Sequence, residues 1–590
     1  MPGHITQIVR KPDNQDRPPP VAAAVLRDSF TKTPFEALDR HTHTHVAQAT
    51  LGLAPSMMGE AWMDWAVHMA TSPGKQMTMA QQALADVQTF WMSSLGLEPA
   101  AVPDDRRFAS DRWQTWPFNV MAQAYQRNET LWQNAMTGVH GVSPQHENLM
   151  AFTAGLMSDA VAPSNFALTN PDVLAATLKA HGANVLQGLR NLTHDATHKD
   201  EAGTAFVVGR DLAATPGKVV FHNDLIELIQ YGPTTARVRP EPILIVPAWI
   251  MKYYILDLSP QNSLVKYLVD QGYTVFMVSW KNPDMADRDR SMEDYRKLGV
   301  MAALDAVTAI TGAPKVHAVG YCLGGTLLSI AAAAMGRDDD DRLASVSLLA
   351  AQVDFTEAGP LKLFINEAEV TLIEDMMEGQ GFLTSDQMAG AFALLHARDL
   401  IWAPMIRDYM LGRRGDAFDL MFWNADGTRM PARMHAEYLR QLFLHNDLAE
   451  GRYHVGPKAI ALTDINAPLF VVGTEDDHVA PWQSVYKLHL FADTDVTFTL
   501  TSGGHNAGIV SEPGHHDRHF RTGHTAEKAA YRDAATWLAE TAPQDGSWWP
   551  VLTDWLQARS GPDVDPPPMG QAEGRYSATA AAPGAYVMQA

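Results

Sequence analysis

The sequence contains very little cysteine, because Cys322 is the only one in 590 residues. A single cysteine excludes a disulfide-stapled scaffold and fits a reducing compartment. The first 20 residues also lack the apolar stretch of a secretory signal peptide. Together, these two absences predict a cytoplasmic protein.

Basic residues are scarce relative to acidic ones: 45 Lys and Arg against 67 Asp and Glu give a formal net charge of -22. This excess of negative charge argues against a nucleic-acid-binding surface, and an anionic substrate would need a local basic patch. Hydrophobic residues make up 46% of the chain, which supports large packed cores. A chain of this length exceeds what one core usually holds, so two or more folding units are expected.

Long uncharged runs are also rare, and the one that stands out covers residues 316–336. Its length would allow it to cross a bilayer. Three glycines near its start imply a turn, however, and a strand followed by a buried helix has the same hydropathy. We therefore predict a core element here and no transmembrane segment.

The pattern along the chain predicts four regions. A polar leader (1–33) precedes a mostly helical N-terminal domain (34–200). Residues 201–560 alternate apolar strand runs with helices, which predicts an α/β fold with a parallel, doubly wound sheet. A Met-, Phe- and Trp-rich helical stretch at about 355–447 interrupts the alternation and predicts an inserted cap. The Pro-, Ala- and Gly-rich tail (561–590) is expected to be mobile.

Buried or half-buried strands are predicted wherever short apolar runs lie between turn signals. These runs are residues 206–209, 219–221, 225–231, 243–247, 274–279, 316–319, 345–350, 469–473 and 496–500, with intervening helices predicted at 263–271 and 291–312.

The stretch Gly320-Tyr-Cys-Leu-Gly324 has the form of the nucleophile elbow of an α/β-hydrolase, with cysteine in place of serine. In such an elbow a strand turns sharply into a helix and carries the nucleophile at the apex. Glycines two residues to either side leave room for the turn and for close helix–strand packing. Apolar residues before Cys322 and helix formers after it fit this arrangement, so Cys322 is predicted to be the nucleophile.

A cysteine nucleophile needs a base and a residue that orients the base. In α/β-hydrolases an acid and then a histidine follow the nucleophile, each on a loop after a late strand. Asp477 follows the run 469–473, and His505 follows the run 496–500. Cys322, Asp477 and His505 are therefore the predicted catalytic residues. Asp354, Asp476 and His478 stay open as alternatives, because each lies on one of the relevant loops.

Two groups of histidines resemble metal ligands but fit no zinc spacing. His41, His43 and His45 alternate within a stretch that is expected to be helical, and His515, His516, His519 and His524 are expected to form a polar loop over the site. The sequence predicts no metal site and no cofactor.

The oxyanion that forms on an attacked carbonyl needs two backbone N–H donors. Leu323, directly after the nucleophile, should supply one donor. Ala248 or Trp249, in the loop after 243–246, should supply the other, because Pro247 has no N–H.

A cysteine nucleophile also exchanges one thioester for another at little free-energy cost, if the substrate is itself a thioester. This chemistry favours acyl transfer over hydrolysis.

Several further stretches resemble class I polyhydroxyalkanoate synthases over residues 100–560. They are Thr215-Pro-Gly-Lys-Val-Val-Phe221, Tyr253-Tyr-Ile-Leu-Asp257, Ser279-Trp-Lys-Asn-Pro283, Gly320-Tyr-Cys-Leu-Gly-Gly-Thr326, Phe422-Trp-Asn424, Asp477-His-Val-Ala-Pro-Trp482, Gly504-His505 and Gly546-Ser-Trp-Trp-Pro550. Residues 34–80 resemble an extra N-terminal segment of part of that family. One departure is Leu323, where valine is common among class I members.

The resemblance implies an α/β-hydrolase fold that polymerises (R)-3-hydroxyacyl-CoA, with short-chain 3-hydroxybutyryl-CoA as the expected monomer, and releases CoA. It implies that Cys322 carries the acyl group, that His505 is its base and that Asp477 is the third member, with a possible role on the incoming 3-hydroxyl. It further implies a homodimer on the surface of intracellular polyester granules, in contact with the growing chain. A cysteine-dependent hydrolase, such as an esterase or polyester depolymerase, is the alternative.

Overall fold

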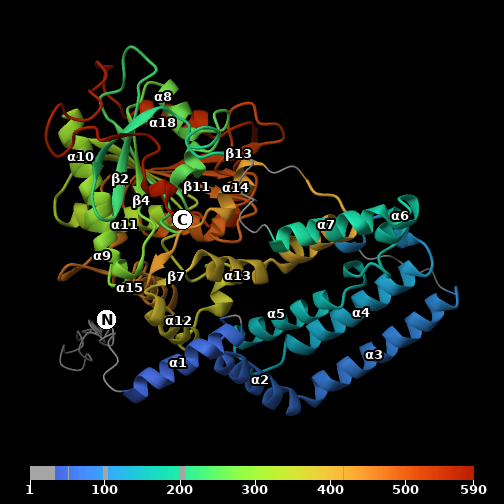
Figure 1. The fold of residues 1–590 in the computed structure, drawn as a ribbon. Coiled ribbons are helices and arrows are strands. Elements are labelled where there is room, and N and C mark those ends of the chain that lie inside the picture. Colours follow the sequence, from blue (N-terminus) through green and yellow to red (C-terminus); the bar gives the residue numbers. More distant parts are fainter. Residues whose placement is uncertain (1–33, 51, 98–103, 198–205, 416–417) are drawn as a thin grey trace, which may run out of the picture.

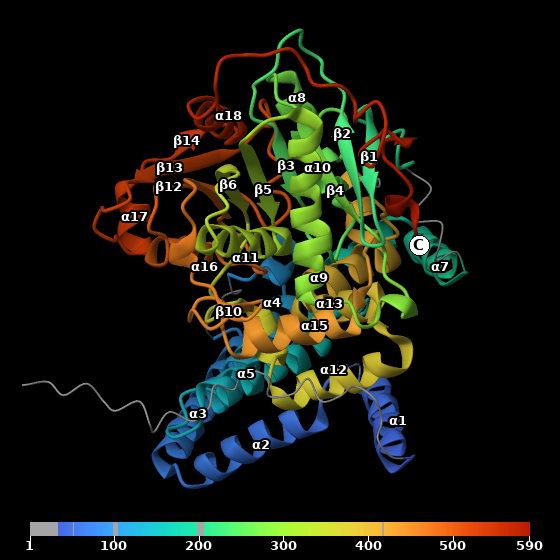
Figure 2. The same cartoon turned by 90° about the vertical axis from the view of Figure 1, so that its left-hand side faces the viewer.

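The computed structural model describes residues 34–590 except 51, 98–103, 198–205 and 416–417, so the predicted leader (1–33) lies outside the described residues. Figure 1 shows a sheet-containing part and, below it, a layer of long helices from the N-terminal part of the chain. Figure 2, turned by 90°, shows the same two layers with the helices α12, α13 and α15 between them.

The N-terminal part is helical, as the sequence predicts. Proline occupies the first turn of four of its helices, where the missing N–H costs nothing. Ser143 and Asn170 cap two of the helices by accepting hydrogen bonds from backbone N–H groups. The helices are α1 (Pro34–Ala49), α2 (Pro55–Ala70), α3 (Pro73–Ser94), α4 (Phe118–Met136), α5 (Pro144–Ala160), α6 (Pro171–Lys179) and α7 (Ala183–Thr197).

The large sheet has the strand order β14-β13-β12-β11-β6-β5-β3-β4-β2-β1-β15. Its strands are β1 (Gly217–His222), β2 (Ile226–Tyr231), β3 (Ile243–Val246), β4 (Val275–Trp280), β5 (Val316–Tyr321), β6 (Leu343–Leu349), β11 (Leu469–Thr474), β12 (Val496–Thr501), β13 (His519–Thr525), β14 (Gln544–Asp545) and β15 (Ala580–Ala581). Two small sheets pair β7 (Phe382–Leu383) with β8 (Met430–Pro431) and β9 (His454–Val455) with β10 (Lys458–Ala459).

The six central strands, from β4 to β12, are parallel, but the strands outside them are antiparallel. The prediction of a wholly parallel sheet is therefore wrong at both edges. β1 and β2 are joined by residues 223–225, and so short a connection permits only an antiparallel pair. The predicted strand at 206–209 is also wrong, because only Val208 makes a bridge there, to Leu212.

Helices cover both faces of the central strands. They are α8 (Leu264–Asp270), α9 (Met292–Asp294), α10 (Ala302–Thr311), α11 (Leu323–Arg337), α16 (Trp482–Tyr486), α17 (Ala534–Glu540) and α18 (Trp549–Gln557). A π-helical segment, Tyr295–Met301, joins α9 to α10, so the helix predicted at 291–312 is one continuous helical stretch. Nearly all of α11 is buried. Burial in the core therefore explains why residues 316–336 carry no charge, and no membrane span is needed to explain it. Among the described helices, none combines the length and apolar character needed to span a bilayer.

The cap lies between β6 and β11, as predicted. It contains α12 (Glu367–Gln380), α13 (Ser385–Leu395), α14 (Asp419–Ala425) and α15 (Ala432–Glu437), together with π-helical segments at 398–402, 405–410 and 438–444. Phe364 and Leu372 of this insertion share a hydrophobic cluster with Met57 and Leu149 of the N-terminal helices. The cap is therefore packed between the sheet and the N-terminal layer.

The C-terminal tail is ordered, so the prediction that it is mobile is wrong. Strand β15 pairs with β1, and Val587 is buried. The carboxylate of Glu227 on β2 accepts hydrogen bonds from the backbone N–H groups of Ala585 and Tyr586, each at 2.9 Å. The tail closes one edge of the sheet, and its docking depends on residues far away in the sequence.

We expect the Glu227→Ala substitution to loosen this tail, because two backbone N–H groups lose a charged acceptor. The free energy of local opening should fall by roughly 1–3 kcal/mol. Hydrogen–deuterium exchange of peptides from residues 579–590 measures this. Glu60→Ala, at an exposed position of α2, is the control and should leave the exchange unchanged. Equal exchange in both variants would contradict the role of Glu227.

Candidate active site

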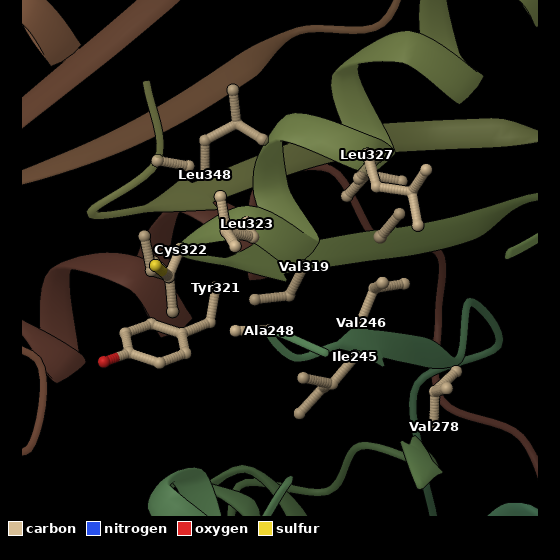
Figure 3. Close-up of a cluster of buried hydrophobic side chains, with 14 of the residues drawn as sticks. Ile245, Val246, Ala248, Val278, Val319, Tyr321, Cys322, Leu323, Leu327 and Leu348 are labelled. Atoms are coloured by element: carbon tan, nitrogen blue, oxygen red, sulfur yellow. The ribbon is translucent and has the colours of Figure 1, made fainter. Parts of the chain in front are cut away.

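Cys322 lies at the turn from β5 into α11, with φ +52° and ψ −127°. A left-handed φ at a residue with a side chain costs about 1–3 kcal/mol and is typical of nucleophile elbows. The backbone N–H of Cys322 donates to Leu349 O at 2.9 Å, which ties the turn to β6. Figure 3 shows the elbow, with Tyr321, Cys322 and Leu323. Below it lie buried hydrophobic side chains that include Ile245, Val246 and Val319.

The flanking glycines are required by close backbone approach. A Cβ atom on Gly320 would lie 2.4 Å from the Cα of Gly325. A Cβ atom on Gly324 would lie 2.2 Å from Val246 O, at the end of β3. Both distances are shorter than any real contact, so the glycines of the motif let α11 start directly against β5 and β3.

Asp477 is held by four hydrogen bonds in the loop after β11. Its Oδ1 accepts from the backbone N–H groups of Val479 and Ala480, each at 2.8 Å. Its Oδ2 accepts from Thr474 Oγ1 at 2.8 Å and from His505 Nδ1 at 2.8 Å. Burial raises the pKa of Asp477, but the charge and hydrogen bond of His505, with the other bonds, outweigh burial and hold the pKa below its ordinary value.

His505 lies in the loop after β12, with its side chain largely enclosed. Burial lowers the pKa of His505, but the charges of Asp477 and Cys322 outweigh burial, so that the pKa lies well above its ordinary value. The hydrogen bond to Asp477 occupies Nδ1 and leaves Nε2 for the nucleophile.

Nε2 of His505 is buried and makes no hydrogen bond of ordinary geometry. Cys322 nevertheless interacts with His505 closely enough to raise its pKa. Catalytic hydrogen bonds are often long or misaligned before substrate binds. The arrangement therefore brings Cys322, His505 and Asp477 together in the predicted order, with the Cys–His contact not fully formed.

The alternative residues are engaged elsewhere or face solvent. Asp354 accepts hydrogen bonds from Thr356 N and Asn446 Nδ2, and its other oxygen lies 3.5 Å from Lys487 Nζ. Asp476 and His478 are exposed, and the ring of His478 lies 5.2 Å from that of His396 in the cap. None of the three contacts His505 through a hydrogen bond in the described part of the chain.

The two histidine groups form no metal site among the described residues. His41 and His45 lie on α1 with their Nε2 atoms 3.1 Å apart, while His43 pairs with Asp375 at 2.6 Å. His519 and His524 lie in strand β13, and His519 pairs with Glu475 at 3.0 Å. The prediction of a polar loop is thus wrong for these last two residues, since they extend the sheet.

The predicted oxyanion donors lie around the elbow. Leu323 is the first residue of α11, where N–H groups have no acceptor within the helix. Ala248 follows β3 and lies beside the elbow in Figure 3. Trp249 is buried, and its carbonyl accepts from Thr428 Oγ1 of the cap. The structure places Leu323 and Ala248 beside Cys322, and the role of all three residues stays a proposal.

Aromatic residues of the cap pack against the loop after β3. The ring of Tyr438 lies 6.1 Å from that of Trp249 and 5.3 Å from that of Phe443. A cavity of about 690 Å³ opens nearby and reaches Phe443 and Pro481, but none of the three catalytic candidates lines it. This cavity therefore does not itself reach Cys322, which is only 9% exposed.

Sequence reasoning missed three residues of this site. Thr474 binds Asp477, and Tyr321 Oη donates to Asn506 Oδ1 at 2.6 Å. Tyr321 and Asn506 are the direct neighbours of Cys322 and His505 in the sequence. Their position beside the candidate catalytic residues was the available signal, but the hydrogen bond between Tyr321 and Asn506 depends on the fold.

We expect Asp477→Asn to slow alkylation of Cys322 at pH 7. Loss of the carboxylate lowers the pKa of His505, because the imidazolium loses its counter-charge, and His505 becomes a weaker base for the Cys322 thiol. The alkylation rate with iodoacetamide should fall about 10-fold or more at pH 7 and recover as the pH rises, since an adjacent charge typically moves a pKa by about 1–3 units.

The exposed neighbour Asp476 provides the control for this experiment. Asp476→Asn should leave the pH dependence of alkylation unchanged. A normal alkylation rate in Asp477→Asn, or a slow one in Asp476→Asn, would show that Asp477 does not support the histidine.

Comparison with family models agrees with the geometry. The model "Poly-beta-hydroxybutyrate polymerase (PhaC) N-terminus" matches residues 104–268, and "Poly-beta-hydroxybutyrate polymerase N terminal" matches 33–75. The "alpha/beta hydrolase fold" model matches 241–511, a range that contains Cys322, Asp477 and His505. Among solved structures, a monoglyceride lipase of Saccharomyces cerevisiae aligns with 59% of this chain and 96% of its own at 10% identity, with a TM-score of 0.32.

Two relatives resemble the chain over most of its length. A poly(3-hydroxyalkanoate) polymerase of Methylorubrum extorquens is 39% identical over 518 residues, covering 84% of each chain. The poly(3-hydroxyalkanoate) polymerase subunit PhaC of Cupriavidus necator is 34% identical over 528 residues, covering 88% of this chain and 89% of its own. With an α/β-hydrolase fold and a cysteine elbow in place, matches of this extent show that the chain belongs to the poly(3-hydroxyalkanoate) polymerase family.

Proposed function

We propose that this protein polymerises (R)-3-hydroxyacyl-CoA into a polyester and releases CoA, with 3-hydroxybutyryl-CoA as the expected monomer. The observation that carries the proposal is the strained elbow with Cys322 beside a buried His505–Asp477 pair, in a chain of this family. The chemistry is acyl transfer through a thioester on Cys322.

In the first step, His505 Nε2 accepts the thiol proton, and the Cys322 sulfur attacks the thioester carbonyl of the substrate. The resulting oxyanion is stabilised by the backbone N–H of Leu323 and by that of Ala248 or Trp249. The C–S bond to CoA then breaks, and the CoA thiolate takes the proton from His505. One thioester replaces another, so the acyl group stays activated.

In the second step, the 3-hydroxyl oxygen of another acyl group attacks a thioester carbonyl and an ester bond forms. The C–S bond of that thioester breaks, and the departing thiolate receives the proton that the hydroxyl has lost. We assign His505 as the base for this proton. The carboxylate of Asp477 has no exposed side-chain surface and uses both oxygens in four hydrogen bonds. It is therefore suited to orienting His505 and not to contacting a hydroxyl itself.

The alternative is a cysteine hydrolase, which would use the same three residues and transfer the acyl group to water. The thioester argument and the family favour the polymerase. The cap over the elbow favours it as well, because Cys322 is only 9% exposed and water has limited access to the acyl-enzyme. No step requires a metal or an organic cofactor.

We further propose that the protein acts as a homodimer on the surface of cytoplasmic polyester granules and holds the growing chain. Exposed apolar side chains on the N-terminal helices support such contacts. They include Trp62 of α2, Leu84 and Trp91 of α3, and Leu186 and Leu189 of α7. Sedimentation of the purified protein, with and without polymer, tests both contacts.

The test of the function supplies purified protein with (R)-3-hydroxybutyryl-CoA and follows free thiol and product. Thiol release together with insoluble polyester is expected. Cys322→Ala should reduce turnover by about 10³-fold or more, because the whole route passes through this atom. Thiol release with free 3-hydroxybutyrate alone would establish the hydrolase and contradict the proposal.

A further inference from the structure

Asn506, the residue after His505, joins three elements through one side chain. Its Oδ1 accepts from Tyr321 Oη at 2.6 Å, and its Nδ2 donates to Asn424 Oδ1 at 3.2 Å. Tyr321 is the last residue of β5 and directly precedes Cys322. Asn424 lies on helix α14 of the cap. One amide thus links the nucleophile strand, the histidine loop and the cap.

The bond between Tyr321 and Asn506 connects the chain next to Cys322 with the chain next to His505. This matters because Cys322 and His505 make no hydrogen bond of ordinary geometry with each other. The Tyr321 side chain is buried, and its ring lies 5.7 Å from that of His505 at an angle of 39°. A buried ring with a hydrogen-bonded hydroxyl is fixed in orientation, so it limits where the imidazole can lie.

Helix α14 is itself held from the opposite side, by the chain that follows β3. Trp423 Nε1 donates to Lys252 O at 2.8 Å, and Tyr254 Oη donates to Asp426 Oδ2 at 2.6 Å. At the other end of the helix, Asn262 Nδ2 donates to Asp419 Oδ2 at 2.8 Å. The position of α14 is therefore fixed by the segment that follows the loop of Ala248 and Trp249. Asn424, on this helix, fixes the position of the Asn506 side chain in turn.

We propose that Asn506 is a positioning residue that sets the distance between Cys322 and His505 and makes this distance depend on the seating of cap helix α14. The inference rests on the proposed catalytic roles of Cys322 and His505. With α14 seated, Asn506 is held by Asn424, Tyr321 is held by Asn506, and the imidazole packs against a fixed ring. When α14 moves away, the Cys322–His505 pair loses this support. Cap placement thus controls the reactivity of the thiol.

The test uses the full-length protein with the variants Tyr321→Phe, Asn506→Ala and Asn424→Ala. Two quantities are measured: the pH profile of Cys322 alkylation by iodoacetamide, and kcat and KM with (R)-3-hydroxybutyryl-CoA. Tyr321→Phe and Asn506→Ala should each lower the alkylation rate at pH 7 and kcat by about 10–100-fold, the usual effect of a small misplacement of reacting groups. KM should stay within about twofold, and Asn424→Ala should act in the same direction but less.

The double variant Tyr321→Phe/Asn506→Ala should be no worse than Asn506→Ala alone, because Asn506→Ala already removes the bond to Tyr321. Glu60→Ala, at an exposed position of α2, is the control, since it touches neither α14 nor the catalytic loops. It should leave the alkylation profile unchanged. Thermal unfolding midpoints confirm that each variant is folded.

Additive losses in the double variant, or unchanged alkylation in Tyr321→Phe and Asn506→Ala, would overturn the inference. A loss in Glu60→Ala equal to that in Asn424→Ala would also overturn it, because a general effect of substitution would then explain the change. Alkylation needs no substrate, so it separates this inference from the proposed function. If the wild-type protein only hydrolyses the substrate while the variants show the expected alkylation rates, the polymerase proposal is refuted and the positioning role of Asn506 stands.

Discussion

The turn at Cys322 is the constraint on which the rest of the site depends. A cysteine at φ +52° is unfavourable in isolation, and it persists because the surrounding structure leaves no other path. Gly320 and Gly324 allow α11 to begin against β5 and β3, and Leu349 O holds the Cys322 amide from the other side. The central position of β5 in the sheet, between β3 and β6, supplies this support.

The same sheet explains why the other two catalytic candidates meet Cys322. β11 and β12 are parallel to β6 and thus to β5, so that the loops after all these strands lie at one edge of the sheet. Asp477 and His505 occupy those loops. Burial by itself lowers the pKa of His505, but the nearby charges of Asp477 and Cys322 outweigh burial and raise it.

The sequence was sufficient to predict that Cys322, an acid from the loop after β11 and His505 lie together, because parallel strands bring the loops that follow them to one edge of the sheet. It was not sufficient to choose Asp477 over Asp476, since the choice depends on which side chain the N–H groups of Val479 and Ala480 can reach. Nor did it reveal the ordered tail. Proline, alanine and glycine indicate mobility locally, whereas docking depends on Glu227 on a distant strand. The antiparallel edge strands were missed for a similar reason, because strand direction follows from connection length and not from hydropathy.

The central claim is that the acyl group passes through a thioester on Cys322. Mass spectrometry of the protein quenched in acid during turnover of (R)-3-hydroxybutyryl-CoA tests it most directly. We predict that the peptide containing Cys322 gains the mass of one or more 3-hydroxybutyryl units, and that the added mass is lost on treatment with neutral hydroxylamine, which cleaves thioesters. An unmodified Cys322 peptide during active turnover, or an acyl group found on another residue, would contradict the account.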